Sequence, residues 1–495
     1  MPFKTKTRPD LIIGNSTAIE RKGADAALRL FQEAAVRVPA YRDFLKKQRI
    51  KPELIRTLAD FQQVPPVDKN NYLTKYSLPE LSWDGTLNNS RIISVSSGSS
   101  GAPLFWPRGK AQDDEGAWMH EQLYQKIFET DRYSSLVVVC FSMGTWIAGS
   151  FTTISTLGAI DHGAQINLVT PGIDQGDAVK AIKNLAKNYQ QVILAGYPPF
   201  IKDVIEQGAR EGIKWKQHRV RLLLAGEAFG EDWRDYVLEL LGKKDPYHDS
   251  VNIYGTADAA MMGHETPVSI AARRIIGEDP EMVKTLFNTD VTPSLLQYYP
   301  DRRYIESVDG ELVFSARAGI PLVRYNIHDT GGVYSYSDLL QPIARRFNKV
   351  VARHGIATED WQLPFVYLAG RKDFTVTVYA VNIYPENIKS ALVDPKMRSW
   401  VTGKFTMATK YYSDMDQYLE INVELADGIT AEPAYQKIAH DTMIANLRKL
   451  NAEYNKLHGA IGTKAEPHIH LVQYGDAEHF GRGVKHRWVR PNGPR

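Results

Sequence analysis

The chain has 495 residues, of which 60 are Lys or Arg and 57 are Asp or Glu, so its formal net charge is only +3. This balance excludes the basic footprint of a nucleic-acid-binding protein, and the length predicts two or three domains. The longest apolar run, residues 136–141, is far too short to span a membrane, and the single cysteine, Cys140, excludes an internal disulfide. We therefore expect a folded cytoplasmic protein whose partners are small molecules.

Helical patterns open the chain, with apolar residues three or four apart in residues 24–31 and 40–45. From residue 92 to residue 253, short β-branched runs alternate with amphipathic stretches, which predicts βαβ units and a mostly parallel sheet covered by helices. The expected strands are 137–141, 165–169, 192–194, 221–225 and 251–254, and the expected helices are 112–129, 174–188, 198–211 and 231–242. In such a sheet, ligands bind at the loops beyond the strand ends.

The second half of the chain has a different pattern. Residues 290–335 favour β-strands, including 310–315 and 320–325, and residues 340–354 predict a basic helix with a solvated face. After residue 373 the pattern reads strand, helix, strand, strand, helix, strand, up to residue 473. We therefore expect an α/β fold: a large N-terminal domain of α/β sheets with a β subdomain, followed by a compact α+β unit of the size of a lid domain.

A run of small residues, Ser96-Ser97-Gly98-Ser99-Ser100-Gly101, lies between two segments that favour strands. Its glycines allow positive φ, its amides can converge on one point, and its serine hydroxyls add donors, which is how a loop binds phosphate. A Ser/Gly-rich hairpin or a flexible linker without a ligand has the same composition. The run alone does not decide between these readings.

Further short motifs follow in the chain, several of them at expected strand ends. They are Gly226-Glu227, Tyr254-Gly255-Thr256-Ala257-Asp258, Arg324-Tyr325-Asn326-Ile327-His328-Asp329, Gly370-Arg371-Lys372-Asp373, residues 381–388 and Gly483-Val484-Lys485-His486-Arg487. Any one of them, taken alone, is compatible with a purely structural role. Their order and spacing carry the information.

In that order and spacing, the motifs resemble those of the adenylate-forming superfamily, the acyl-CoA synthetases and adenylation domains. Within it, the chain is similar to the phenylacetate-CoA-ligase-like branch, whose early segment is matched by residues 39–41 and 61–69. The resemblance spans nearly the whole chain. It implies an enzyme that uses ATP and Mg²⁺ to convert a carboxylic acid to an acyl-adenylate with release of pyrophosphate.

The resemblance also implies roles for single residues. Residues 96–101 would hold the β- and γ-phosphates, and Asp258 would bind Mg²⁺, a cation that prefers carboxylate and phosphate oxygens. Lys485 would bridge the carboxylate and the α-phosphate as a catalytic residue, and Asp373 would be the hinge between an N-terminal domain, 1–369, and a mobile lid, 374–495. Asp329 would bind the ribose, Tyr254 would stack on adenine and Arg371 would contact ribose or phosphate, while the remaining nucleotide contacts would come from Gly226, Glu227, Gly255 and Thr256.

The chain departs from the family pattern in four places, one of which covers two adjacent residues. Ala102 stands where the phosphate loop has lysine, Ala257 lacks a hydroxyl before an Asp258 that replaces the usual glutamate, and His328 replaces a glycine. Ala380 replaces the glycine before the hairpin that lines the pantetheine tunnel in CoA ligases. We expect its methyl group to narrow that passage and to resist positive φ, which puts CoA as the acceptor in question.

The acid pocket is expected at strand ends, with walls from Met143, Trp146, Tyr197, Phe200 and Ala225, although these residues equally suit a hydrophobic core. Their aromatic character favours an aryl or bulky acid. The second product of the branch is most often a CoA thioester. Transfer to an amine, a hydroxyl or another nucleophile, an adenylyltransferase that leaves AMP on its substrate, and a degenerate nucleotide-binding protein are the alternatives. We expect a monomer or homodimer without nucleic-acid or membrane partners.

Overall fold

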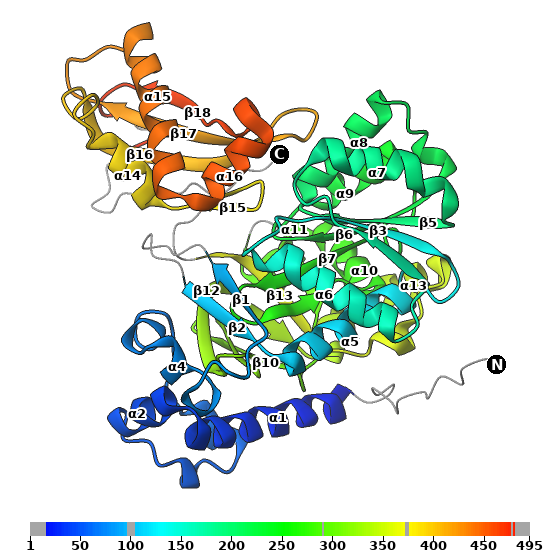
Figure 1. Ribbon diagram of the computed structural model, residues 1–495. Coiled ribbons are helices and arrows are strands. Elements are labelled where there is room, and N and C mark those ends of the chain that lie inside the picture. The colour runs from blue at the N-terminus through cyan, green and yellow to red at the C-terminus, as the bar shows by residue number, and fades with distance from the viewer. Residues whose placement is uncertain (1–15, 97–103, 290–291, 372–375, 477–478, 481–495) are drawn as a thin grey trace.

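The computed structural model describes residues 16–96, 104–289, 292–371, 376–476 and 479–480. A large N-terminal part precedes a smaller C-terminal part, drawn in yellow to red in Figure 1. This is the expected α/β fold class. None of the helices in the described ranges has the length and apolar character that crossing a bilayer requires.

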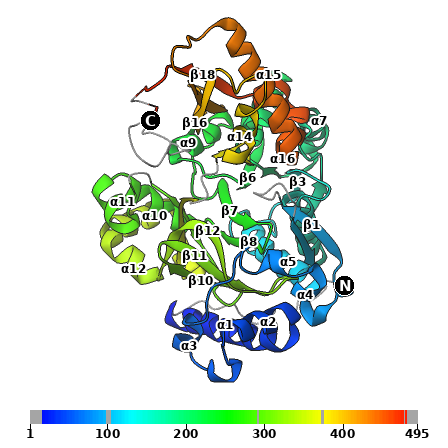
Figure 2. The ribbon, with the colours of Figure 1, turned by 90° about the vertical axis from the view of Figure 1, so that its left-hand side faces the viewer.

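A helical module forms the start of the described chain, at the end of the molecule opposite the C-terminal part (Figure 2). Its helices are α1 (Ser16–Arg37), α2 (Pro39–Lys47), α3 (Leu58–Gln62) and α4 (Leu78–Leu81). Val38 separates α1 from α2 in an extended conformation, because Pro39 disfavours helical geometry in the residue before it. Phe31, Tyr41, Phe61 and Tyr72 join the module to the same buried cluster as β11 and β12, described next. The helices expected at 24–31 and 40–45 are thus confirmed.

An 11-stranded sheet spans the N-terminal part in the order β10-β11-β12-β13-β9-β8-β7-β6-β5-β3-β4. Its strands are β3 (Ser135–Cys140), β4 (Ile166–Val169), β5 (Gln191–Gly196), β6 (Arg219–Ala225), β7 (Ser250–Thr256), β8 (Ala260–His264), β9 (Ser294–Gln297), β10 (Arg303–Val308), β11 (Glu311–Ala316), β12 (Leu322–Tyr334) and β13 (Phe365–Arg371). Strands β3 to β7 pair in parallel, and the remaining pairs are antiparallel. The mostly parallel sheet expected for residues 92–253 is therefore confirmed, and the antiparallel half is formed by later residues of the chain.

Helices cover both faces of the parallel half. They are α5 (Lys110–Lys126), α6 (Ile147–Asp161), α7 (Gln175–Leu185), α8 (Pro198–Arg210) and α9 (Glu231–Leu240), followed by α10 (Pro267–Gly277), α11 (Pro280–Phe287), α12 (Tyr336–Leu340) and α13 (Ala344–His354). In β3, Val137 and Val139 belong to the cluster with α5 and α10, whereas Leu136 and Val138 belong to the cluster with α7 to α9. Both faces of this strand are buried, so its sequence is apolar from Leu136 to Cys140.

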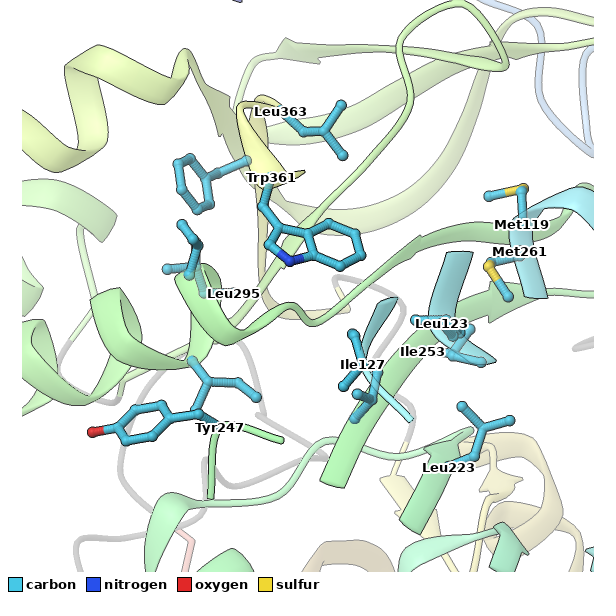
Figure 3. Close-up of a cluster of buried hydrophobic side chains, with 14 of the residues drawn as sticks. Met119, Leu123, Ile127, Leu223, Tyr247, Ile253, Met261, Leu295, Trp361 and Leu363 are labelled. Carbon is cyan, nitrogen blue, oxygen red and sulfur yellow. The ribbon is translucent and has the colours of Figure 1, made fainter. Parts of the chain in front are cut away.

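The cluster on the α5 and α10 side is drawn in Figure 3. Met119 and Leu123 of α5 lie next to Ile253 and Met261 of β7 and β8, and Trp361 fills the space toward β9. The close packing of this core holds the ends of β6 and β7 in place, because a well-packed interior resists displacement.

Helix α6 was not among the expected helices. Its sequence is apolar or small nearly all round, so it lacks the one-sided period that identifies a surface helix. The hydroxyl groups of Thr153 and Thr156 donate hydrogen bonds to backbone carbonyls one turn earlier in the same helix. Such a helix is recognised only once its packing between α5 and the sheet is known.

Strands β1 (Ile92–Ser96) and β2 (Leu104–Arg108) form an antiparallel hairpin in which Ser96 is paired with Leu104. The small-residue run therefore joins two strands, as expected. Ser97, Gly98, Ser99, Ser100 and Gly101 lie outside the described residues, as does Ala102.

The C-terminal part contains the hairpin β14 (Val376–Val378) and β15 (Val381–Ile383), and a sheet of β16 (Val401–Tyr411), β17 (Gln417–Leu425) and β18 (His468–Val472). Its helices are α14 (Pro385–Leu392), α15 (Pro433–Leu450) and α16 (Ala452–Ile461). The expected order of elements is correct except that the first strand is a hairpin and the second helix is broken in two. The break falls at Asn451, whose side chain accepts a hydrogen bond from the Tyr454 amide and caps α16.

Candidate active site

A cavity of about 360 Å³ lies beyond the ends of β6 and β7, between the large sheet and the β14–β15 hairpin. Its lining brings together most of the residues that the motifs singled out. These are Ser96, Gly226, Glu227, Tyr254, Gly255, Thr256, Asp258 and Asp329. Of these, the residues from Gly226 to Asp258 lie at or beyond the carboxyl ends of the parallel strands β6 and β7, which share one edge of the sheet. Ser96 comes from the separate β1–β2 hairpin, and Asp329 comes from the antiparallel strand β12.

Asp258 is 5% exposed, and its Oδ2 atom has no hydrogen-bond partner within the described residues. A buried carboxylate oxygen without a partner is costly unless a ligand or ion satisfies it. Because the atom belongs to a residue that lines the cavity, its chemistry fits a site for Mg²⁺, which favours carboxylate oxygens.

Tyr254 and Asp329 lie next to each other in the wall of the cavity. The Tyr254 hydroxyl donates a 2.6 Å hydrogen bond to Oδ2 of Asp329, and both residues are buried. In the pairing of β12 with β13, Asp329 lies directly opposite Arg371, whose side chain is not described. The ring of Tyr254 and the carboxylate of Asp329 are thus neighbouring features of one wall.

Lys69 and Asn252 are two of the lining residues that were not predicted as site residues. Lys69 is the last residue of the early segment 61–69, lines the cavity and makes no ion pair within the described ranges. Asn252 donates from Nδ2 to the Glu227 carbonyl at 3.2 Å, while its buried Oδ1 atom has no partner in the described part of the chain. Both residues lie close in sequence to recognised motifs, since Lys69 ends the segment 61–69 and Asn252 lies two residues before Tyr254. Neither residue has a distinctive local sequence pattern that would identify it as a site residue.

Glu227 connects the two parts of the molecule. One oxygen accepts a hydrogen bond from the Ala380 amide, and the other accepts a 2.6 Å bond from Nε2 of Gln417. Burial raises the pKa of this carboxyl to about 7, and these two hydrogen bonds oppose the rise. A group predicted to contact nucleotide therefore also contacts the C-terminal hairpin in this arrangement.

The raised pKa predicts a pH-dependent stability. The pKa of Glu227 is higher in the folded than in the unfolded protein, so the folded state favours the protonated carboxyl. The contribution of this group to the free energy of unfolding is present below about pH 4.5 and is lost as the pH rises through about 7. Glu227→Gln has no titrating carboxyl at this position and so does not undergo this loss. As the pH rises from about 5 to about 8, the unfolding free energy of the variant should therefore increase relative to that of wild type by up to roughly 3 kcal/mol. Thermal unfolding over this range measures it, with the exposed Glu239→Gln as control. Parallel pH profiles for wild type and Glu227→Gln would contradict the prediction.

The turn between β14 and β15 corrects one expectation. Tyr379 and Ala380 have φ values of 48° and 61°, so Ala380 does adopt positive φ. A two-residue hairpin turn of this hand requires positive φ at both positions, and the bond to Glu227 holds the Ala380 amide. A Cβ atom added to Gly226, which has φ +90°, would lie 3.2 Å from the Ala380 methyl, so the two residues are packed together.

The residues expected to form the acid pocket are only partly brought together. Trp146 and Tyr197 line the large cavity, and with Phe200 they also line a neighbouring cavity of about 50 Å³ that reaches Tyr379 and α16. Met143 and Ala225 line neither of these cavities, and Met143 packs close to Gly149 and Gly172. Lys485, expected to be catalytic, and Asp373, expected to be the hinge, lie outside the described residues.

No family model matches the sequence, and no curated protein matches it. Among solved structures, the chain is similar to 2-hydroxyisobutyryl-CoA ligase in complex with 2-HIB-AMP and CoA in the thioesterification state, with 16% identity, coverage of 99% of this chain and 94% of that chain, and a TM-score of 0.68. Against an open conformation of that ligase with the same ligands, at 16% identity and coverage of 99% and 97%, the TM-score is 0.56. Against its postadenylation state in complex with R3-HIB-AMP, at 16% identity and coverage of 99% and 94%, it is 0.57.

These similarities show that the chain has the fold of 2-hydroxyisobutyryl-CoA ligase. Of these three states of one ligase, the thioesterification state gives the highest TM-score.

Proposed function

We propose that the protein is an AMP-forming ligase that activates a carboxylic acid with ATP and then transfers the acyl group to the thiol of CoA. In the first step a carboxylate oxygen attacks the α-phosphorus, the bond to the β-phosphate oxygen breaks and pyrophosphate leaves. In the second step the thiol sulfur attacks the acyl carbon, the thiol proton is lost and AMP leaves. The observation that carries the proposal is the convergence of Tyr254, Asp258 and Asp329 in one cavity that the C-terminal hairpin also lines.

The nucleoside would be bound by the wall that contains Tyr254 and Asp329. The Asp329 carboxylate can accept hydrogen bonds from both ribose hydroxyls, and the Tyr254 ring offers a flat face to the adenine. The unpartnered Oδ1 of Asn252 suits the amino group of the base. Gly226, Gly255 and Thr256 would complete this subsite, with Arg371 contacting ribose or phosphate.

The phosphates would lie between residues 96–101 and Asp258. Mg²⁺, held by Asp258, would supply positive charge to the phosphate oxygens. Lys69 adds a cation on the same cavity, which suits a phosphate loop whose usual lysine is replaced by Ala102. Lys485 would approach the α-phosphate from the C-terminal part, which we propose moves as a lid, residues 374–495, about a hinge at Asp373.

We propose an aryl or bulky acid, because Trp146, Tyr197 and Phe200 surround the space next to the nucleotide cavity. The early segment at 61–69, from which Lys69 reaches the cavity, supports placing the chain in the phenylacetate-CoA-ligase-like branch. An amine acceptor is the second candidate. The observation that favours it is the contact of the Ala380 methyl with Gly226, which narrows the approach of a long thiol arm.

Isotope exchange between pyrophosphate and ATP tests the first step. Exchange should require Mg²⁺ and one class of acid from a panel of aryl, arylacetic and medium-chain acids, and it should not require CoA. Adding CoA or an amine then identifies the acceptor by the product formed. If protein that binds ATP gives no exchange with any carboxylic acid, and AMP is recovered on another substrate, the ligase proposal is wrong and an adenylyltransferase replaces it.

A further inference from the structure

Charged side chains from both parts of the molecule meet where α8 faces the C-terminal sheet. Lys202, Asp203 and Glu206 lie on α8, Asp416 lies in the turn between β16 and β17, and Lys464 precedes β18. Lys202 Nζ is 2.6 Å from Asp416 Oδ1 and 2.7 Å from Glu206 Oε1. Lys464 Nζ is 2.9 Å from Asp416 Oδ2 and also pairs with Asp203. Asp416 thus bridges a lysine of each part.

This cluster is buried at its centre. The side chain of Lys202 is fully covered, and that of Asp203 is only 5% exposed. The carboxylates of Asp203, Glu206 and Asp416 are close enough to share one cation, but the two lysine ammonium groups already lie among them. The cluster is therefore an ion-pair network. Removing one partner of a buried pair is costly, because the other charge stays desolvated and unpaired.

The turn that carries Asp416 has a second, apolar contact with the N-terminal part. Met415, which precedes Asp416, packs against the hydrophobic cluster formed with α8 and α9. The same short turn is therefore held by apolar packing at Met415 and by ion pairs at Asp416. These two contacts fix the position of the C-terminal sheet next to α8 (Figure 1).

The residue after Asp416 links this turn to the active site. Gln417 donates from Nε2 to Glu227, which lines the nucleotide cavity, and its Oε1 atom accepts a 2.9 Å hydrogen bond from the Tyr379 amide at the hairpin tip. Seating the turn on α8 thereby places Tyr379 and Ala380 against Gly226 and Glu227. If the turn were released, Gln417 would withdraw from Glu227.

We propose that Lys202, Asp203, Glu206, Asp416 and Lys464 form an interdomain latch that positions the β14–β15 hairpin for acyl transfer and takes no part in adenylation. The inference rests on the proposed function, since it assigns the latch to the second of two steps. All five are positioning residues, because they act through Gln417 and the hairpin and line neither of the cavities near the reaction.

The kinetic test separates the two steps. In Asp416→Asn and in Lys464→Met, the rate of acyl transfer from preformed acyl-adenylate should fall by roughly tenfold if the seated arrangement drops to about a tenth of the population. Pyrophosphate exchange should stay within about twofold of wild type, and Asp427→Asn, at an exposed turn of the same C-terminal part, should change neither rate. An equal fall in both steps, or an unchanged transfer rate, would overturn the latch.

A distance measurement tests the latch without any activity. Cys140 is the single cysteine and is buried, so nitroxide labels can be directed to Lys187→Cys and Lys437→Cys, two exposed positions in the N-terminal and C-terminal parts. Electron paramagnetic resonance should give one narrow distance distribution with the latch intact and a shifted or broadened one in Asp416→Asn and Lys464→Met. A distribution like that of wild type in both variants would overturn the latch. Absence of pyrophosphate exchange in wild type would instead overturn the proposed function.

Discussion

Asp258→Asn is expected to lower Mg²⁺-dependent pyrophosphate exchange by about 100-fold or more. Asparagine keeps the volume and one oxygen of the side chain but removes the negative charge that Mg²⁺ prefers. Even residues that only support a metal ligand change metal affinity by roughly 10- to 100-fold when they are replaced, so a direct ligand should cost at least as much. Titrating Mg²⁺ at saturating ATP and acid measures the effect, and the half-saturating Mg²⁺ concentration should rise.

The control for this prediction is Asp309→Asn, which makes the same change at an exposed turn where φ is 51°, a conformation that asparagine tolerates. It should leave exchange and Mg²⁺ dependence unchanged. The unpartnered buried Oδ2 atom is the structural reason to expect a large effect at Asp258. A Mg²⁺ dependence in Asp258→Asn equal to that of wild type would exclude this residue as a metal ligand.

Asp329→Ala is expected to weaken ATP binding by about 100-fold. A hydrogen bond to a charged group contributes roughly 1.5–3 kcal/mol, and a carboxylate that binds two ribose hydroxyls would lose both. Tyr254→Phe should weaken binding by only about tenfold, because it keeps the ring and removes the one hydroxyl that donates to Asp329. Isothermal titration calorimetry with ATP compares both variants with wild type.

The order of these effects is the informative result. If Tyr254→Phe weakened ATP binding as much as Asp329→Ala, the 2.6 Å hydrogen bond from Tyr254 would be required to position the Asp329 carboxylate. The proposal that Asp329 binds the ribose hydroxyls would then lose its support. If neither variant changed the affinity for ATP, this wall of the cavity would not be the nucleoside subsite. Dependence of affinity on the 2′-hydroxyl, tested with 2′-deoxy-ATP, should be lost in Asp329→Ala.

Much of the site could be predicted because its residues carry local signals. Gly226 and Tyr254 lie at or near the ends of β6 and β7, where a change from β-branched to small or polar residues is visible in the chain. Asp329 follows an expected strand, although the observed strand β12 continues past it. The strand β3 was recognisable because burial on both faces makes it apolar from Leu136 to Cys140. These features depend on neighbours within a few residues, which a single sequence contains.

Other features depend on contacts between distant segments. Helix α6 was missed because its exposed side also carries an apolar residue, Leu157, so the sequence shows no clear polar face. Lys69 and Asn252 reach the cavity only because the fold brings the early segment and β7 to one edge of the sheet. The extent of the antiparallel half was also missed, since the pairing of β13 with β9 joins strands about 70 residues apart.

By itself, the sequence determined the fold class, the set of strand-end motifs and the kind of chemistry that their residue types suit, because periodicity, turn residues and side-chain chemistry are local properties. Only the tertiary structure decided which candidates share a cavity, that Trp146 and Tyr197 face it while Met143 does not, and that Glu227 and Asp416 connect the two parts of the chain. The physical reason is that burial and pairing between distant residues arise from the packing of whole elements, and no single segment encodes its partner.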